Sequence, residues 1–145
     1  MDWQQIAKED SRRYQGLKQA QKQIDERLVF LEEQYTTLKS AKIEDIPIHG
    51  GEETMEDKLL TNIVNRERLK SQHGNNERVI VWVENGLKCI TDEERFLLDV
   101  FYIRPQRTAV CIAMEKLSYS KTHVYRLRDD ALRRFTLYQY GLAEN

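Results

Sequence analysis

A seven-residue repeat of large apolar side chains in the first forty residues constrains the fold more than any other feature of the sequence. The repeat consists of Leu17, Ile24, Leu31 and Leu38, with Leu28 and Tyr35 at intermediate positions. This alternating spacing places the side chains on one face of an α-helix, as in a coiled-coil seam. We therefore predict a helix over residues 3–40. A lone amphipathic helix is only marginally stable in water, so a second helix must cover this face.

A second apolar stripe supplies a candidate partner helix. Residues 40–53 break the helical pattern with Ile46-Pro47 and Gly50-Gly51, which are typical of a loop. Helical periodicity then resumes, with Thr54 and Asp57 spaced as a capping box. We predict one long helix over residues 54–88. Its stripe consists of Met55, Leu59, Ile63 and Leu69. The two helices form an antiparallel hairpin or pair with a second copy of the chain, and the pattern leaves both arrangements open.

Composition favours an all-α chain that does not enter a membrane. Only two prolines and six glycines occur in 145 residues, which disfavours strand-and-turn architectures. No segment approaches the roughly 20 apolar residues that a membrane span requires, and the N-terminus has no apolar stretch. We expect a cytoplasmic protein. Cys89 and Cys111 belong to no CxxC or Cys/His cluster, so we expect them to be small buried apolar residues, with no metal or cofactor.

The charge is divided unevenly along the chain. The formal net charge is only −1. The segment from Arg104 to Arg134, however, contains eight Lys and Arg residues and only three Asp and Glu residues. The residues before Arg104 contain fifteen basic and twenty acidic side chains. A basic C-terminal segment joined to an acidic N-terminal part indicates two roles, and the basic part is suited to nucleic acid.

The C-terminal region divides into three predicted helices. These helices cover residues 92–103, 106–117 and 120–138, and Thr91 with Glu94 forms a capping box before the first. Residues 118–120 connect the last two helices, a length typical of a helix-turn-helix. We therefore predict two domains: residues 1–90 as a helical hairpin or coiled-coil region for oligomerisation or partner binding, and residues 91–145 as a DNA-binding domain.

The final predicted helix begins with polar side chains of the kind that contact DNA. In a helix-turn-helix the first turns of the second helix enter the major groove. Lys and Arg donate to guanine, and Thr contacts base edges with its hydroxyl or methyl group. The supporting helix begins near Arg104, Arg107 and Thr108, where side chains and the helix N-terminus bind phosphate. The alternative interpretation is the solvated face of an ordinary three-helix bundle.

The run LSYSKTHVYRLRDDALRRF, residues 117–135, resembles the recognition-helix signature of region four of bacterial sigma factors. The whole chain resembles phage-encoded transcriptional regulators of the ArpU/RinA type, with a helical N-terminal part, an Ile-Pro and Gly-Gly loop, a second long helix and a sigma-like end. The resemblance implies a regulator of phage late genes that binds double-stranded DNA in a bacterial host cell and works with host RNA polymerase.

The resemblance also implies roles for individual residues. Lys121, Thr122 and Arg126 correspond to the residues that contact bases. The phosphate-contacting set consists of Arg104, Arg107, Thr108, Ser120, His123, Tyr125 and Arg128. Two departures stand out: Ser118 replaces a common glycine, and Thr122 replaces a common acidic residue, which places a consensus minus-35 target in doubt. The promoter-melting regions of sigma factors have no counterpart.

Other functions compete with this interpretation. A phage small terminase-like packaging subunit would also combine a helix-turn-helix with helical oligomerisation elements. A sigma-like module that binds RNA polymerase or another protein is a further alternative. The sequence contains no phosphate-binding glycine loop, metal-ligand spacing or nucleophile motif, so we expect no enzymatic activity. We expect a homo-oligomer, most simply a dimer, formed through the N-terminal helices.

Overall fold

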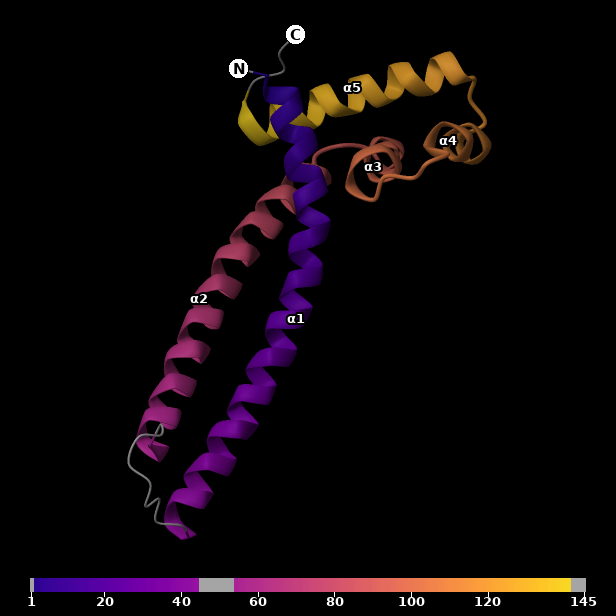
Figure 1. Cartoon of the computed structure of the whole chain (residues 1–145). Coiled ribbons are helices and arrows are strands. Elements are labelled where there is room, and N and C mark those ends of the chain that lie inside the picture. Colours follow the sequence, from indigo (N-terminus) through magenta and orange to yellow (C-terminus); the bar gives the residue numbers. More distant parts are fainter. Residues whose placement is uncertain (1, 45–53, 142–145) are drawn as a thin grey trace. The chain divides into compact units, whose positions relative to one another are not determined.

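The computed structural model describes residues 2–44 and 54–141, and over these residues the chain is all-α (Figure 1). This confirms the predicted fold class. The elements are α1 (Trp3–Glu44), α2 (Met55–Lys88), α3 (Asp92–Leu98), the π-helical turn η1 (Asp99–Ile103), α4 (Ala109–Leu117) and α5 (Lys121–Tyr140). The predicted loop containing Ile46-Pro47 and Gly50-Gly51 lies outside the described residues. None of the described helices is long and apolar enough to cross a membrane.

The two long helices match the predicted periodicity. Helix α1 continues to Glu44, past the predicted end at residue 40. Helix α2 is continuous through Gly74, as predicted. The capping box before α2 is present, because the Asp57 amide donates to Thr54 Oγ1 (3.1 Å) and the Thr54 amide donates to the Asp57 carboxylate (3.3 Å). Local hydrogen bonds thus determine where α2 begins.

Contacts divide the described residues into two compact units. The two-helix unit comprises residues 19–44 and 54–77, and the core unit comprises residues 2–18 and 78–141. Both α1 and α2 contribute residues to each unit. This division differs from the predicted boundary at residue 90, because the N-terminal turns of α1 and the last turns of α2 pack in one hydrophobic cluster with α5.

The two-helix unit pairs α1 and α2 in antiparallel order (Figure 1). Near one end, Gln21 donates to the His73 carbonyl oxygen (3.0 Å). Further along, the Asn62 side chain donates to the Leu31 carbonyl oxygen (2.8 Å). Because the residue numbers rise along one helix as they fall along the other, the apolar seam of α1 contacts α2 of the same chain.

Buried polar side chains interrupt that seam. Asn62 is 2% exposed, and its oxygen accepts a hydrogen bond from Arg66 Nε (2.8 Å). Gln21 is 7% exposed and also contacts Glu77 and Asn76. A buried amide that loses its partner costs about 1–3 kcal/mol, so these pairs disfavour any shifted alignment of the two helices.

The core unit contains two hydrophobic clusters, and α5 contributes to both. The first cluster consists of Ala7, Tyr14, Ile80, Val83, Ile90, Leu98, Ile103, Ala131, Leu132 and Phe135. The second has Leu97, Ala113 and Val124 at its centre. The N-terminal half of α5 therefore packs on α3 and α4, while its C-terminal half packs on α1 and α2.

Polar groups at the edge of the first cluster are paired. Tyr14 donates its hydroxyl hydrogen to Glu84 Oε2 (2.9 Å), and burial together with this bond raises the pKa of Tyr14 to about 12. The Tyr140 hydroxyl donates to the Asp10 carboxylate. These bonds connect α1 to α2 and to α5 within the core unit.

The segment between α3 and α4 departs from the predicted helix boundaries. The predicted helix over residues 92–103 is α-helical only to Leu98 and continues as the π-helical turn η1, in which the Arg104 amide donates to the Asp99 carbonyl oxygen (2.8 Å). Helix α4 begins at Ala109, three residues after the predicted start at 106. Helix α5 begins at Lys121 and ends at Tyr140, close to the predicted range 120–138.

The prediction that Cys89 and Cys111 are buried is wrong, because both side chains are exposed. Cys111 lies between Ala109 and Ala113, which face the core, and a position two residues from each lies on the opposite side of a helix. Cys89 lies outside the helices, in the turn that follows the last residue of α2, Lys88. Apolar content alone did not specify which face each cysteine occupies.

Glycine 86 allows α2 and α5 to approach closely. A Cβ atom at Gly86 would lie 2.1 Å from Oε1 of Gln139. Gln139 is itself buried, with 8% of its surface exposed. We predict that Gly86→Ala lowers the free energy of unfolding by about 1–3 kcal/mol, because the covered Gln139 side chain must move. Chemical denaturation monitored by circular dichroism measures this change.

A double-variant cycle tests the cause. Gly74→Ala, at a helical position in α2 with open space around it, should raise stability by about 0.5–1 kcal/mol. Adding Gln139→Ala should recover most of the loss from Gly86→Ala. If the changes in the free energy of unfolding caused by Gly86→Ala and Gln139→Ala simply add, the close approach of the two residues does not explain the loss.

Candidate nucleic-acid interface

Helices α4 and α5 are joined by Ser118, Tyr119 and Ser120, the connection predicted from the sequence. Ser118 has a left-handed backbone (φ 59°, ψ 40°) that ends α4. The Ser120 hydroxyl oxygen then accepts from the His123 amide (3.2 Å) and caps α5. Ser118 is the only non-glycine residue with positive φ in the described part of the chain.

The second hydrophobic cluster sets α4 and α5 against α3. Leu97, Ala113 and Val124 are completely buried. The partly buried residues around them are Phe96, Phe101, Met114, Leu117, Tyr119 and Leu127. Val124 of α5 packs in this cluster with Ala113 of α4. One side of the beginning of α5 is therefore buried, and its opposite side is exposed to solvent.

The three candidate base-contacting residues lie on the exposed N-terminal turns of α5. Lys121, Thr122 and Arg126 are all exposed. Thr122 and Arg126 are each two residues from the buried Val124, which places both on the helix face opposite the core. The structure thus brings Thr122 and Arg126 together on one outward surface, with Lys121 in the first turn.

A neighbouring histidine orients Arg126. Arg126 Nη2 lies 2.8 Å from His123 Nδ1. The His123 ring packs edge-on against Tyr119, with ring centroids 4.5 Å apart. The Tyr119 hydroxyl in turn donates to the Glu93 carboxylate (3.2 Å), and this bond raises the pKa of Tyr119. A contact chain therefore runs from α3 to Arg126, which limits the conformations of that guanidinium group.

Two arginines among the candidate phosphate-contacting residues, Arg128 and Arg104, are held by other side chains of the chain. Arg128 stacks on the rings of Tyr125 (4.8 Å) and Phe101 (5.1 Å), and its Nη2 lies 2.9 Å from the Asp129 carboxylate. Arg104 forms two hydrogen bonds to Asp99 (3.0 and 2.8 Å). These bonds raise the pKa of Arg104. Their guanidinium groups are therefore already engaged within the chain.

The remaining phosphate candidates differ in how freely they reach solvent. Arg107 and Thr108 are exposed and directly precede α4, and the Thr108 side chain forms no capping bond. Ser120 uses its hydroxyl as the cap of α5. Arg107, with the N-terminus of α4, is thus the candidate best placed to approach a phosphate from beside the α5 surface.

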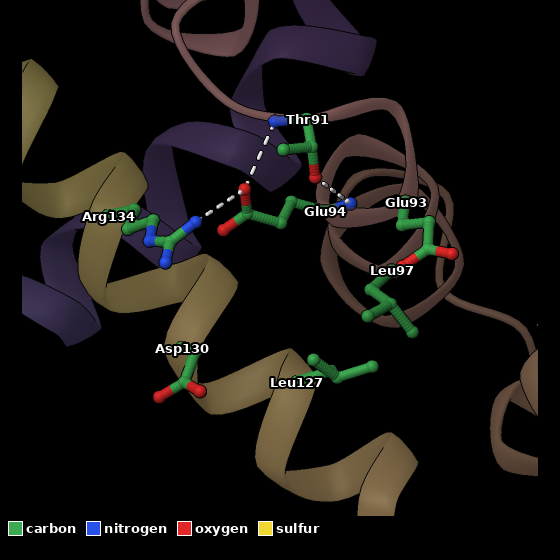
Figure 2. A pocket seen from close by; sticks show the side chains of 7 residues that line it. All are labelled: Thr91, Glu93, Glu94, Leu97, Leu127, Asp130 and Arg134. Carbon is green, nitrogen blue, oxygen red and sulfur yellow. Dashed lines mark hydrogen bonds and ion pairs between the residues drawn. The ribbon is translucent and has the colours of Figure 1, made fainter. Parts of the chain in front are cut away.

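An ion pair between buried Glu94 and exposed Arg134 could not be predicted from local sequence patterns. Glu94 of the α3 capping box is 6% exposed, and its Oε1 accepts from the Thr91 amide (3.1 Å) and from Arg134 Nη1 of α5 (3.2 Å) (Figure 2). No local signal marks this contact, because the two residues are 40 positions apart. The bond attaches the start of α3 to the fourth turn of α5.

The pocket in Figure 2 is unsuited to phosphate. Its volume is about 220 Å³, and its lining residues are Thr91, Glu93, Glu94, Leu97, Leu127, Asp130 and Arg134. Three carboxylates against one guanidinium repel an anion. In the described residues, no group of three or more His, Cys, Asp or Glu side chains is placed to bind a metal ion.

Comparisons with protein-family models, with curated proteins and with solved structures find no match to this chain.

The unusual backbone at Ser118 generates a stability prediction. A left-handed conformation costs an L-residue about 1–2 kcal/mol, which glycine avoids at some cost in unfolded-state entropy. Ser118→Gly should therefore raise the free energy of unfolding by about 0.5–1 kcal/mol. Thermal denaturation measures the change. Ser120→Ala is the contrasting variant, because loss of the α5 cap should lower stability by about 1 kcal/mol; a destabilised Ser118→Gly variant would contradict the assigned turn geometry.

Proposed function

We propose that this chain is a sequence-specific, double-stranded DNA-binding transcriptional regulator, with α5 entering the major groove. The observation that carries the proposal is the outward surface of Lys121, Thr122 and Arg126 on the first two turns of α5. These three side chains are exposed and project from a helix that is supported by buried Val124. Their donors match guanine O6 and N7 and the polar edges of neighbouring bases.

The surrounding charge is suited to an anionic partner such as DNA. From Arg104 to Arg128 the sequence contains six Lys and Arg residues and one acid, Glu115. Asp130 lies 3.3 Å from Arg133 Nη1, so the acidic third turn of α5 is partly compensated. Positive potential around the N-terminus of α5 would attract the phosphate backbone and orient the recognition residues.

The biological role follows the resemblance to regulators of the ArpU/RinA type. In this proposal the protein controls phage late genes in the cytoplasm of a bacterial host, as a dimer through its N-terminal helices and together with host RNA polymerase. It needs no cofactor and catalyses no reaction. The small terminase-like and polymerase-binding alternatives predict different outcomes in the experiment that follows.

The first test is selection of DNA fragments from a random pool at about 150 mM salt, where non-specific phosphate attraction is weakened. We expect an enriched motif for the wild-type protein. Arg126→Ala should weaken binding to that motif by about 1–3 kcal/mol, with little change on random DNA. Arg12→Ala, which removes the same charge from an exposed position on α1, is the control and should bind normally.

Two outcomes of that selection would oppose the proposal. Equal losses on specific and random DNA for Arg126→Ala would show that Arg126 does not contact bases. No enrichment by a folded wild-type protein would favour the polymerase-binding or other protein-binding alternative.

Arg107 should act on affinity without acting on sequence preference. Replacement of this exposed residue by alanine removes one phosphate contact, so binding should weaken to a similar extent on all sequences. The slope of log K against log salt should fall in magnitude by about 1. Fluorescence anisotropy on the selected motif and on a scrambled duplex measures both quantities. A loss confined to the selected motif would instead identify Arg107 as a base contact.

A further inference from the structure

The contact between His123 and Arg126 specifies the protonation state of the histidine. Arg126 Nη2 lies 2.8 Å from His123 Nδ1. A guanidinium group only donates hydrogen bonds, and it does not lose its proton in proteins. His123 Nδ1 is therefore the acceptor, so the ring is neutral and carries its hydrogen on Nε2. A doubly protonated ring would direct an N–H at the guanidinium group and add a second positive charge beside it.

Two further segments of the chain hold the His123 ring. The ring packs edge-on against Tyr119 of the connection between α4 and α5, with an angle of 84° between the ring planes. The Tyr119 hydroxyl lies 3.2 and 3.4 Å from the carboxylate oxygens of Glu93 on α3. In the part of the chain that the structure describes, the titratable and charged groups placed around the ring are therefore Arg126, Tyr119 and, behind Tyr119, Glu93.

Arg126 differs from Arg104 and Arg134 in the charge of its partner. Arg104 pairs with the Asp99 carboxylate (2.8 Å), and Arg134 pairs with the Glu94 carboxylate (3.2 Å). Among the described residues, no carboxylate forms an ion pair with Arg126. A neutral imidazole restricts the guanidinium group without cancelling its charge, whereas a carboxylate would compete with the acceptors of a base edge. The N–H groups that His123 does not use remain for guanine O6 and N7.

We propose that His123 is a positioning residue for sequence recognition: its neutral ring holds Arg126 for a base contact, and protonation of the ring releases the guanidinium group. The inference rests on the proposed function, because it concerns the residue that contacts bases there. It gives His123 a role different from the phosphate contact that the sequence resemblance implied. Sequence-specific affinity then depends on the protonation of this one ring.

The two roles of His123 predict opposite effects of pH. A histidine that contacts phosphate binds more strongly when it is protonated, so affinity would rise on every sequence as the pH falls. A histidine that must accept from Arg126 supports binding only when it is neutral, so affinity for the selected motif would decrease as the pH falls. Histidine side chains ordinarily titrate at about pH 6.5, which places the change between about pH 8 and about pH 5.5.

Fluorescence anisotropy on the selected motif and on a scrambled duplex, at about 150 mM salt, tests the proposal at these two pH values. For the wild-type chain we expect affinity for the motif to be about three- to tenfold weaker at the lower pH, as expected for loss of one hydrogen bond. Affinity for the scrambled duplex should be unchanged or slightly higher. Circular dichroism verifies that the chain remains helical. A motif affinity that rises as the pH falls, or an equal change on both duplexes, would overturn the proposal.

Two substitutions separate the acceptor from the ring. His123→Asn keeps an acceptor near the place of Nδ1 but does not titrate, whereas His123→Phe keeps a ring beside Tyr119 but cannot accept from Arg126. We expect His123→Phe to bind the motif about three- to tenfold more weakly than the wild type at about pH 8, and His123→Asn to recover part of that loss. Neither variant should weaken further at the lower pH. A wild-type pH dependence retained by both variants would show that another group titrates, which would contradict the proposal.

His73→Gln is the matched control for the pH dependence. His73 has the same kind of titratable ring, and its Nε2 lies 3.1 Å from the Asp25 carboxylate in the two-helix unit. The substitution keeps the His73 carbonyl oxygen that accepts from Gln21. We expect this variant to show the pH dependence of the wild type. Loss of the dependence in His73→Gln would assign the titration to the two-helix unit and count against His123.

NMR of the free chain separates failure of this inference from failure of the proposed function. The nitrogen chemical shifts of the His123 ring report which nitrogen carries the hydrogen, and we expect the Nε2–H form at about pH 8. A ring with its hydrogen on Nδ1, in a chain that selects a DNA motif, would overturn only the positioning role. The Nε2–H form in a folded chain that selects no motif would overturn the proposed function, and with it control of DNA binding, while the contact with Arg126 stood.

Discussion

The packing of α5 on two hydrophobic clusters is the constraint on which the candidate interface depends. Val124 is buried with Leu97 and Ala113, while Leu132 and Phe135 are buried two turns later among residues of α1 and α2. A helix supported over its whole length has little freedom to rotate. Its outward face is consequently defined by what it buries, and Thr122 and Arg126 occupy that face because they lie opposite Val124.

Polar contacts add specificity to this packing. Glu94 accepts hydrogen bonds from its own capping box and from Arg134, so the beginning of α3 and the fourth turn of α5 are bonded directly. Arg128 stacks on Phe101 and Tyr125 instead of extending to solvent. The basic residues of α5 therefore differ in their surroundings: some stabilise the arrangement of helices, and others remain exposed to solvent.

The two-helix unit likewise has a buried seam between its helices and an exposed outer side. Its seam contains the buried amides of Gln21 and Asn62, each hydrogen-bonded across the helix pair. Those bonds favour one alignment of α1 and α2, because a shifted alignment would leave an amide without its partner. With the alignment determined, the side of α2 that faces away from α1 has a defined orientation.

The sequence by itself determined the all-α class, the two long helices, both capping boxes and the three-residue connection between α4 and α5. These features depend on interactions between residues three, four or seven positions apart, which a local pattern records. Tertiary structure alone decided that Cys89 and Cys111 face solvent, that the helix beginning at Asp92 ends in a π-helical turn, that Arg128 stacks on aromatic rings, and that Glu94 meets Arg134. Each of these outcomes depends on contacts between distant segments, and their energies appear only when the helices pack.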